Sequence, residues 1–226
     1  MNPFLLVLLG YLAGATPTSY WVGRAFHGVD LRTRGSGNLG ATNAFRVMGW
    51  KAALPVVLVD VGKGWLPVWL FPRIDASGTM LWALAYGAAA IVGHVFSVWV
   101  RFRGGKGVAT SAGVFLGLAP WSVLVGLLVF AVTVTATRIV SLGSILAALC
   151  LPFAVAYGPG AWPPGEKASL VWFTAALALF VIWAHRSNIR RLLRGEERRF
   201  GRKGEPSSEG PTGDDPHPPG EERRRT

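Results

Sequence analysis

Long, nearly uninterrupted apolar segments follow one another along most of this chain, and they constrain its fold more than any other feature. Most of them approach the roughly 20 residues that a helix needs to cross the hydrocarbon core of a bilayer. With 51% hydrophobic and only 15% charged residues, the chain cannot be one soluble domain around a single core. We therefore expect an all-α integral membrane protein with spans near 3–22, 52–71, 80–100, 108–135, 142–157 and 168–184.

Basic residues gather in some gaps between these segments, whereas the gaps 72–79 and 158–167 carry no net charge. If every basic gap is cytoplasmic, the chain crosses the membrane an even number of times between Lys106 and Arg138. Pro120 interrupts the apolar segment between them, which predicts a pair of short helices that meet near residue 119, neither long enough to span comfortably. The expected fold has seven transmembrane helices, with the N-terminus outside and the C-terminus cytoplasmic.

The net charge of +11 does not indicate a nucleic-acid-binding protein, because the basic residues lie in the gaps and the tail rather than on one soluble face. The single cysteine, Cys150, excludes a disulfide scaffold. Scattered carboxylates offer no metal-ligand spacing, so neither a metal nor a cofactor is expected. We expect a membrane-embedded domain over 1–200, which ends in a short basic amphipathic helix over 188–200, and a disordered cytoplasmic tail over 201–226.

The first basic gap, 32–46, has the composition of an anion-binding loop. Its glycines let the backbone turn and approach a ligand, and amides in such turns bind anions. Arg34 and Arg46 add charge suited to phosphate. An alternative is that the glycines serve only the turns and the arginines only mark the topology. The neutral hydrogen-bonding candidates are Ser36, Asn38, Thr42 and Asn43.

The third gap, 101–111, places a lysine among glycines just before a helix, where free amides and the helix dipole favour an anion. Its candidate phosphate-binding residues are Gly104, Gly105, Lys106 and Gly107. Both loops follow the rough pattern R-x-R-G-[SG], and A-T-[NS] comes several residues later. Two such loops on one side of the membrane predict two phosphorylated ligands.

Other polar residues lie near the same ends of the expected helices. His185 and Asn188 are three apart and share a helix face if the last span continues to Arg191. His94 could be a packed structural residue or a catalytic one. Asp60 and Lys63, inside the second span, favour an ion pair that locks the bundle over a direct substrate contact. A further group could line the cytoplasmic layer or form an ordinary helix cap: Arg138, Ser141 and Ser144.

Three motifs resemble the bacterial acyl-phosphate:glycerol-3-phosphate acyltransferases, the PlsY family. They are Ser36-Gly-Asn-Leu-Gly-Ala-Thr-Asn43, Gly93-His94-x-Phe96 together with Phe102-Arg-Gly-Gly-Lys-Gly-Val-Ala-Thr110, and His185-Arg-x-Asn-Ile-x-Arg-Leu-Leu193. Asp60-x-x-Lys63-Gly64 and Ser141-Leu-Gly-Ser144 also look like that family. The resemblance covers about residues 1–200. It implies transfer of a fatty acyl group from acyl phosphate to the 1-hydroxyl of glycerol 3-phosphate, which gives lysophosphatidate and phosphate at the bacterial inner membrane.

On this interpretation Ser36, Arg46 and Lys106 hold phosphate, His185 and Asn188 orient the acceptor hydroxyl, and His94 polarises the donor or assists proton movement. Because an acyl phosphate has a good leaving group, no covalent enzyme nucleophile is required. The partners are the two substrates and membrane lipid, and a monomer is expected to suffice. The alternatives are a multi-pass transporter of a small phosphorylated solute, which needs polar groups along a midplane path, and a lipid-binding membrane scaffold.

Overall fold

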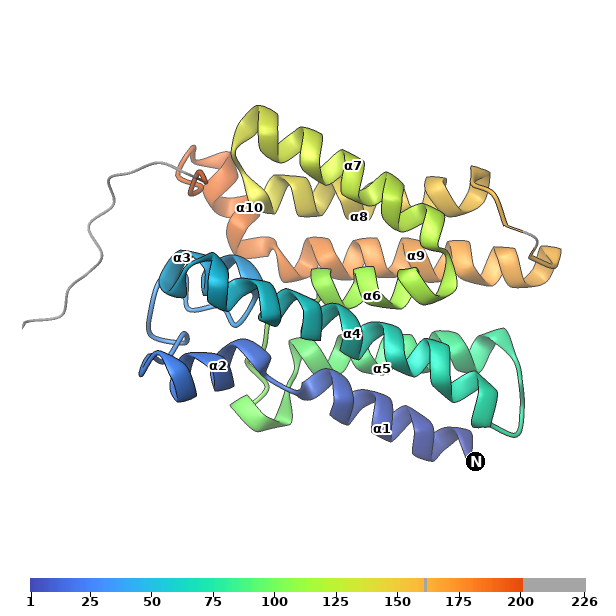
Figure 1. Ribbon diagram of the computed structural model, residues 1–226. Helices are drawn as coiled ribbons and strands as arrows, with labels where there is room; N and C mark the ends of the chain where they lie inside the picture. Colours follow the sequence, from blue (N-terminus) through green and yellow to red (C-terminus); the bar gives the residue numbers. More distant parts are fainter. Residues whose placement is uncertain (161, 201–226) are drawn as a thin grey trace, which may run out of the picture.

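The computed structural model describes residues 1–160 and 162–200, and every regular element in that part of the chain is helical. The expected disordered tail, 201–226, lies outside the described residues. Figure 1 shows long helices running side by side, with short ones gathered at one end. In chain order the helices are α1 Pro3–Ala15, α2 Thr18–Phe26, α3 Ala41–Met48, α4 Trp50–Ile74, α5 Met80–Val95, η1 Val98–Val100, α6 Val108–Leu118, α7 Pro120–Thr137, α8 Val140–Tyr157, α9 Pro164–Ala184 and α10 Arg186–Leu193.

Six segments of the described chain are long and apolar enough to cross a membrane, and α6 is a shorter apolar helix of 11 residues. The predicted break at Pro120 is confirmed, because Ala119 has a non-helical conformation and Pro120 begins α7. The expectation that neither half spans is wrong for α7. That helix continues to Thr137 and has 18 residues, about 27 Å at 1.5 Å per residue. Proline at the first helical position leaves the ladder of α7 complete.

The first span contains a break that the apolar pattern did not predict. Pro17 separates α1 from α2, although residues 3–26 together have the length and hydropathy of one membrane span. A broken helix leaves carbonyl groups unpaired, which is costly in a membrane. Lys63 Nζ donates to the Thr16 carbonyl at 2.8 Å and pairs with Asp60 Oδ1 at 2.7 Å, and Thr18 Oγ1 donates to the same oxygen at 3.2 Å. The predicted Asp60–Lys63 pair is therefore present, and it holds the α1–α2 break against α4.

Glycines bring the backbones of neighbouring helices unusually close. A Cβ on Gly113 of α6 would lie 1.9 Å from the Val61 carbonyl oxygen of α4, and one on Gly64 of α4 would lie 2.1 Å from the Thr110 carbonyl oxygen of α6. Helices α1 and α5 meet in the same way, with a Cβ on Gly14 placed 2.0 Å from the Ala90 carbonyl oxygen. Small residues permit this close packing in a membrane, where no hydrophobic force drives helices together.

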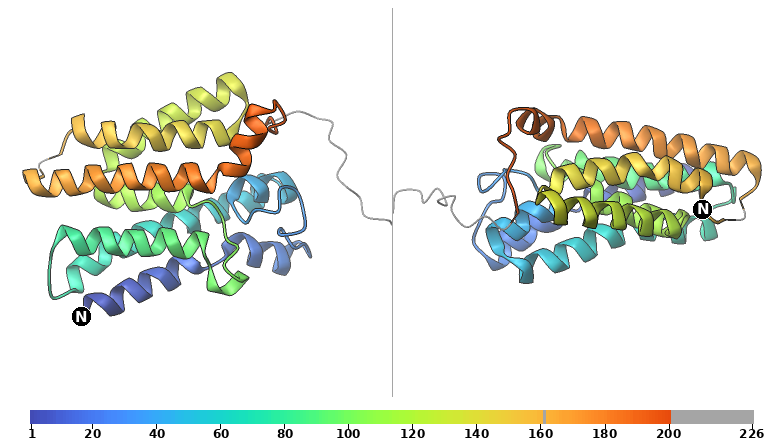
Figure 2. Two further views of the ribbon diagram at one scale, coloured as in Figure 1. Left: turned by 180° about the vertical axis from the view of Figure 1, so that it is seen from behind. Right: turned by 90° about the horizontal axis from the view of Figure 1, so that it is seen from above.

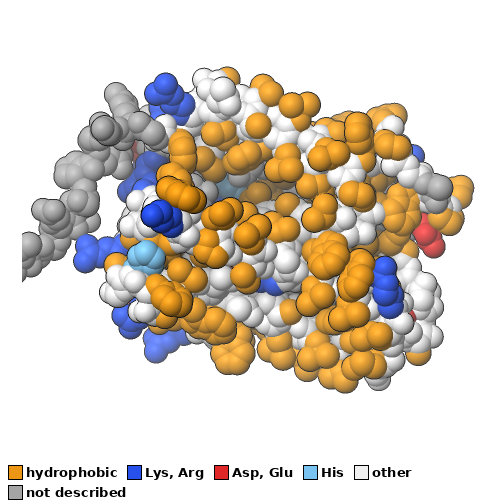
Figure 3. Space-filling model, in the orientation of Figure 1, with side chains coloured by type: hydrophobic (Ala, Val, Ile, Leu, Met, Phe, Trp, Pro, Cys, Tyr) orange, Lys and Arg blue, Asp and Glu red, His pale blue; other side chains and the backbone are white. Residues whose placement is uncertain are grey.

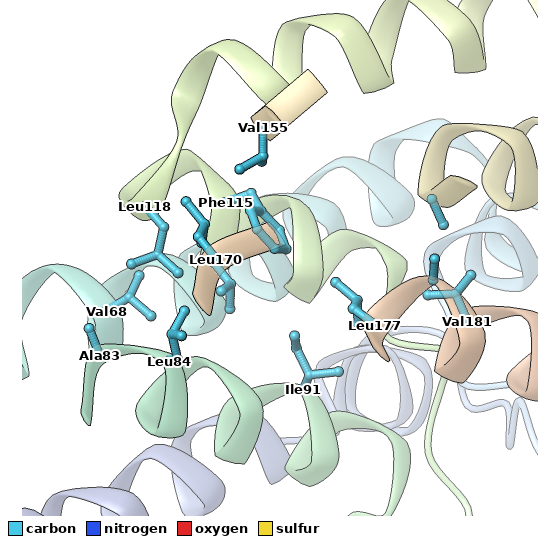
Figure 4. Packing of buried hydrophobic residues seen from close by; sticks show 13 residues of the cluster. Val68, Ala83, Leu84, Ile91, Phe115, Leu118, Val155, Leu170, Leu177 and Val181 are labelled. Atoms are coloured by element: carbon cyan, nitrogen blue, oxygen red, sulfur yellow. The ribbon is translucent and has the colours of Figure 1, made fainter. Parts of the chain in front are cut away.

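The bundle has two halves, which the views of Figure 2 show from behind and from above. Helices α1, α4, α5 and α6 pack on one another, while α7 and α8 form a neighbouring pair and α8 packs on α9. A buried cluster joins the halves where Leu118, Val155 and Leu170 meet Phe115 (Figure 4). The outer surface is apolar along most of its length. Figure 3 shows Lys and Arg gathered mainly at the end where α3 and α10 lie.

Candidate active site

A cavity of about 690 Å³ begins at this basic end and runs between α4, α6, α7, α8 and α9. One part of its wall is polar and cationic, and the other part is apolar. The polar wall brings together most of the residues singled out from the sequence: Ser36, Asn38, Thr42, Asn43, Arg46, His94, Lys106, Gly107, Ser141, Ser144, His185 and Asn188. The apolar wall includes Phe115, Val123, Phe130, Leu151, Leu177 and Val181.

Asn43 gives the first loop its shape. Its side-chain amide donates to the carbonyls of Asn38 at 2.9 Å, Arg34 at 3.1 Å and Leu31 at 3.3 Å, and its Oδ1 accepts from the Ser36 amide at 2.8 Å. Gly35 has φ +61°, and a Cβ there would lie 2.2 Å from Asn43 Oδ1. Asn43 therefore positions the loop, because its polar atoms are already engaged within the protein.

The wound loop presents Ser36 to the cavity, and α3, which begins just after Gly40, presents Thr42 and Arg46. The Oδ1 atom of Asn38 accepts from the Gly40 amide at 2.9 Å, which fixes the chain as it enters α3. Ser36 and Arg46 are exposed at the basic end, where a water-soluble ligand can reach them. A hydroxyl and a guanidinium together suit a phosphate group.

The glycines of the third loop have two different roles. The amides of Gly104 and Gly105 donate to the carbonyls of Val95 at 2.9 Å and His94 at 3.1 Å, so neither is available to a phosphate, and these glycines do not line the main cavity. A Cβ on Gly105 would lie 2.1 Å from His94 Nε2. Their expected phosphate contact is therefore replaced by a packing role against the end of α5. Gly107, with φ +82°, lines the cavity and directly precedes α6.

Lys106 and Asn188 meet inside the cavity, although 82 residues separate them in the sequence. Lys106 Nζ donates to Asn188 Oδ1, and the amide of Asn188 donates to Glu197 Oε1. Glu197 also accepts from Ser141 Oγ at 2.8 Å and pairs with Arg191 Nε at 2.7 Å. A carboxylate of the chain thus lies among the cationic groups of the site.

Glu197 was not among the residues singled out from the sequence, because 188–200 was expected to form one amphipathic surface helix. That prediction is wrong after Leu193, because α10 ends at this residue and Gly195 then turns the chain with φ +70°. The segment that follows turns back over the cavity, and Phe200 packs on Phe45 with ring centroids 4.9 Å apart. The available signal was an acidic pair in an otherwise basic segment directly after the last helix.

Burial sets the ionisation of the central groups. It lowers the pKa of Lys106 from 10.5 to about 8, against the opposing charge of Glu197 and with the help of Arg191 and Arg46. Burial, with the charge of Lys106, lowers the pKa of His185 to about 4, so this ring is neutral at pH 7. Burial raises the pKa of Glu197, but the hydrogen bonds from Asn188, Ser141 and Arg191 outweigh it, and the net shift is downward.

His185 lies where α9 ends and α10 begins, so it and Asn188 are not on one continuous helix as expected, yet both are buried and line the cavity. Its Nδ1 lies 2.8 Å from the Val181 carbonyl. Because a carbonyl only accepts, Nδ1 carries the hydrogen and Nε2 keeps a lone pair. His185 can therefore accept a hydrogen bond from a hydroxyl.

Two other candidates have different surroundings. His94 is buried at the end of α5, where its Nδ1 lies 3.8 Å from Asp60 Oδ1, and both residues line the cavity. Arg138 ends α7 in a left-handed conformation and is exposed outside the cavity wall. Its carbonyl accepts from the Phe200 amide at 2.6 Å, so Arg138 anchors the segment that carries Glu197.

Known proteins similar in sequence to this chain share one description. The family model described as glycerol-3-phosphate acyltransferase matches residues 4–195. A glycerol-3-phosphate acyltransferase of Anaeromyxobacter sp. (strain K) is 46% identical over 200 residues, which cover 86% of this chain and 96% of that protein. One of Chlorobaculum tepidum is 40% identical over 228 residues, with 88% and 97% covered.

Solved structures agree with these relatives. The crystal structure of PlsY, an integral membrane glycerol 3-phosphate acyltransferase, in its glycerol 3-phosphate form is similar with a TM-score of 0.78 and 34% identity. The match covers 88% of this chain and 96% of that one. The lysophosphatidic acid form of PlsY gives a TM-score of 0.77 and 32% identity. The similarity therefore includes the helices that form the cavity.

Proposed function

Because this chain belongs to the glycerol-3-phosphate acyltransferase family, which acylates glycerol 3-phosphate in phospholipid synthesis, we propose that acyl phosphate is its donor and that the reaction takes place in the cavity described above. The products are then lysophosphatidate and inorganic phosphate. One observation carries the proposal: a single cavity joins a cationic polar wall to an apolar wall inside the bundle. Family membership also decides against the transporter and scaffold alternatives.

Both substrates fit this division. Each has a phosphate group, which suits Ser36, Arg46 and Lys106 on the polar wall. The donor also has a fatty acyl chain, which suits the apolar wall between α7, α8 and α9. The two ends of the cavity thus bring a lipid-soluble donor to a water-soluble acceptor.

The transfer forms one carbon–oxygen bond and breaks another. The 1-hydroxyl oxygen attacks the carbonyl carbon of the donor, and the bond from that carbon to the phosphate oxygen breaks. The neutral His185 accepts a hydrogen bond from the hydroxyl at Nε2, and Asn188 and Lys106 hold the acceptor beside it. The proton leaves with the departing phosphate, so no side chain needs to be the final base. His94 assists at the carbonyl.

Lys106 and Arg46 neutralise the negative charge that develops on the leaving phosphate. Ser141 and Ser144 complete the polar wall on α8, and Asn38, Thr42 and Gly107 complete it beside the loops. The donor is already activated as a mixed anhydride. Positioning and charge neutralisation by these groups are then sufficient to accelerate the transfer.

The same proposal includes a topology for this multi-pass membrane protein. The basic end, with α3, α10 and the cavity mouth, faces the cytoplasm of a bacterial cell, and the N-terminus lies outside the inner membrane. Seven helices cross if α6, which runs outward from the cytoplasmic side, and α7, which runs back, are counted as the even pair. Residues 1–200 form the working unit. A monomer is expected to suffice as the functional form.

The test is direct. Purified protein receives synthetic acyl phosphate and glycerol 3-phosphate, and phosphate release and lysophosphatidate are measured, with acyl-CoA as a parallel donor. We expect release only when acyl phosphate and acceptor are both present. Equal turnover with acyl-CoA would overturn the proposed donor, and a Lys106→Ala variant with wild-type turnover would overturn the proposed site.

A further inference from the structure

The apolar part of the cavity has a definite floor. Phe115, Leu177 and Leu151 are the lining residues of α6, α9 and α8 that lie farthest from the basic end. Phe115 is fully buried, and the same hydrophobic cluster continues beyond it with Leu118, Val155 and Leu170, as Figure 4 shows. Those three side chains do not line the cavity. The cluster therefore closes the cavity within the bundle.

The depth of this floor matches one leaflet of a bilayer. Ser141 on the polar wall and Leu151 at the floor are ten residues apart on α8, which corresponds to about 15 Å at 1.5 Å per residue. Half of the roughly 30 Å hydrocarbon core is also about 15 Å. The cavity thus has room for the acyl chain of an ordinary membrane lipid, with its terminal methyl group near Leu151.

The wall that α7 contributes has no side-chain bulk at Gly126. This buried glycine lines the cavity and faces α8 directly. A Cβ there would lie 3.7 Å from Leu151 Cδ2 and 4.0 Å from the Ala147 carbonyl oxygen, which are ordinary van der Waals contacts. A methyl group therefore fits without moving the helices, whereas a longer side chain would compete with Leu151 and an acyl chain for the space beside α8.

We propose that Gly126 and Leu151 together set the acyl-chain length that this enzyme accepts. Gly126 leaves the lower part of the cavity open, and Leu151 ends it. The inference rests on the proposed function, because the occupant is the acyl chain of the phosphorylated donor. It goes further by assigning the length limit to one glycine on α7 and one leucine on α8.

The test is a series of acyl phosphates of increasing chain length, with kcat/KM measured for each at fixed glycerol 3-phosphate. Gly126→Leu fills the lower part of the cavity, so it should lower kcat/KM for long donors at least tenfold relative to short ones. Leu151→Ala should move the optimum to longer donors and raise their relative kcat/KM several-fold. Leu149→Ala is the matched control, because Leu149 is 42% exposed on the outer face of the same helix.

The outcomes are separable. Retained turnover of short donors by Gly126→Leu shows that the variant is folded, and if that variant is inactive with every donor, Leu151→Ala alone decides. Wild-type length profiles in both variants would overturn the inference, because they would mean that long chains leave the cavity sideways into lipid. Failure of the proposed function would look different, since the wild-type protein would then turn over no acyl phosphate of any length.

Discussion

The ionisation of Lys106 predicts an alkaline limit to activity. Burial of its amine lowers its pKa from 10.5 to about 8, so at pH 7 about nine molecules in ten have the cation that meets the phosphate. At pH 9 only about one in ten keeps it. We therefore expect kcat/KM for glycerol 3-phosphate to fall through a midpoint near pH 8 and then about tenfold per pH unit. The substrate is a dianion throughout this range, since the second pKa of a phosphate ester is about 6.

The sign of the effect follows from the charge. Loss of the Lys106 proton removes an attractive contact to phosphate, so activity decreases as the pH rises. A bound phosphate stabilises the cation and raises the pKa of Lys106 in the complex. The decline in kcat should consequently lie at higher pH than the decline in kcat/KM.

The assay is initial phosphate release between about pH 6 and about pH 10, with blanks that contain the donor alone. Lys106→Arg is the informative variant, because an arginine stays charged over the whole range. Its rate is lower if the geometry suffers, but its alkaline decline should disappear. Lys51→Arg, at an exposed position of α4 away from the cavity, should keep the wild-type profile. An unchanged midpoint in Lys106→Arg would refute the argument.

Three further predictions concern other parts of the structure. Glu197→Gln removes a negative charge that raises the pKa of Lys106, so it should lower kcat/KM about tenfold or more and move the alkaline midpoint to lower pH. An unchanged midpoint would count against the interaction of Glu197 with Lys106 and Asn188. Gly113→Ala should destabilise the protein in detergent by about 1–3 kcal/mol, because the new Cβ would lie 1.9 Å from the Val61 carbonyl oxygen and would force α4 and α6 apart. Gly62→Ala is the control and should not destabilise it, because a Cβ there meets open space. His185→Ala should lower kcat more than it raises KM, and a loss confined to KM would remove its role at the acceptor hydroxyl.

The sequence predicted those parts of the fold that depend on local chemistry. Apolar length identifies a membrane span without reference to its neighbours, and proline at 120 breaks a helix wherever it lies. The break at Pro17 was hidden because α1 and α2 together have the length of one span. Its stability depends on Lys63, which reaches the Thr16 carbonyl from another helix, and periodicity does not reveal such a contact.

The site could be predicted by residue type more easily than by role. Asn43, Gly104 and Gly105 were singled out as ligand-binding residues, yet their polar groups or backbones are used to shape the loops. An amide that binds phosphate and one that holds a turn look identical in a sequence, because only the location of the partner distinguishes them. Glu197 was missed for the same reason: its partners Ser141 and Asn188 become neighbours only when the chain turns after Leu193.

The turn after Leu193 has a consequence for where the working enzyme ends. A chain cut directly after α10 would keep all of the membrane helices and both glycine loops, but it would lose the counter-ion that Glu197 supplies. Lys106, Arg191 and Arg46 would then repel one another each time a phosphate departed. When no substrate is bound, the Glu197 carboxylate takes the place of the phosphate, so these cationic side chains keep their positions until the next substrate binds. We therefore expect a chain that ends after Leu193 to lose activity that a chain ending after Phe200 keeps, because Glu197 and Phe200 line the cavity.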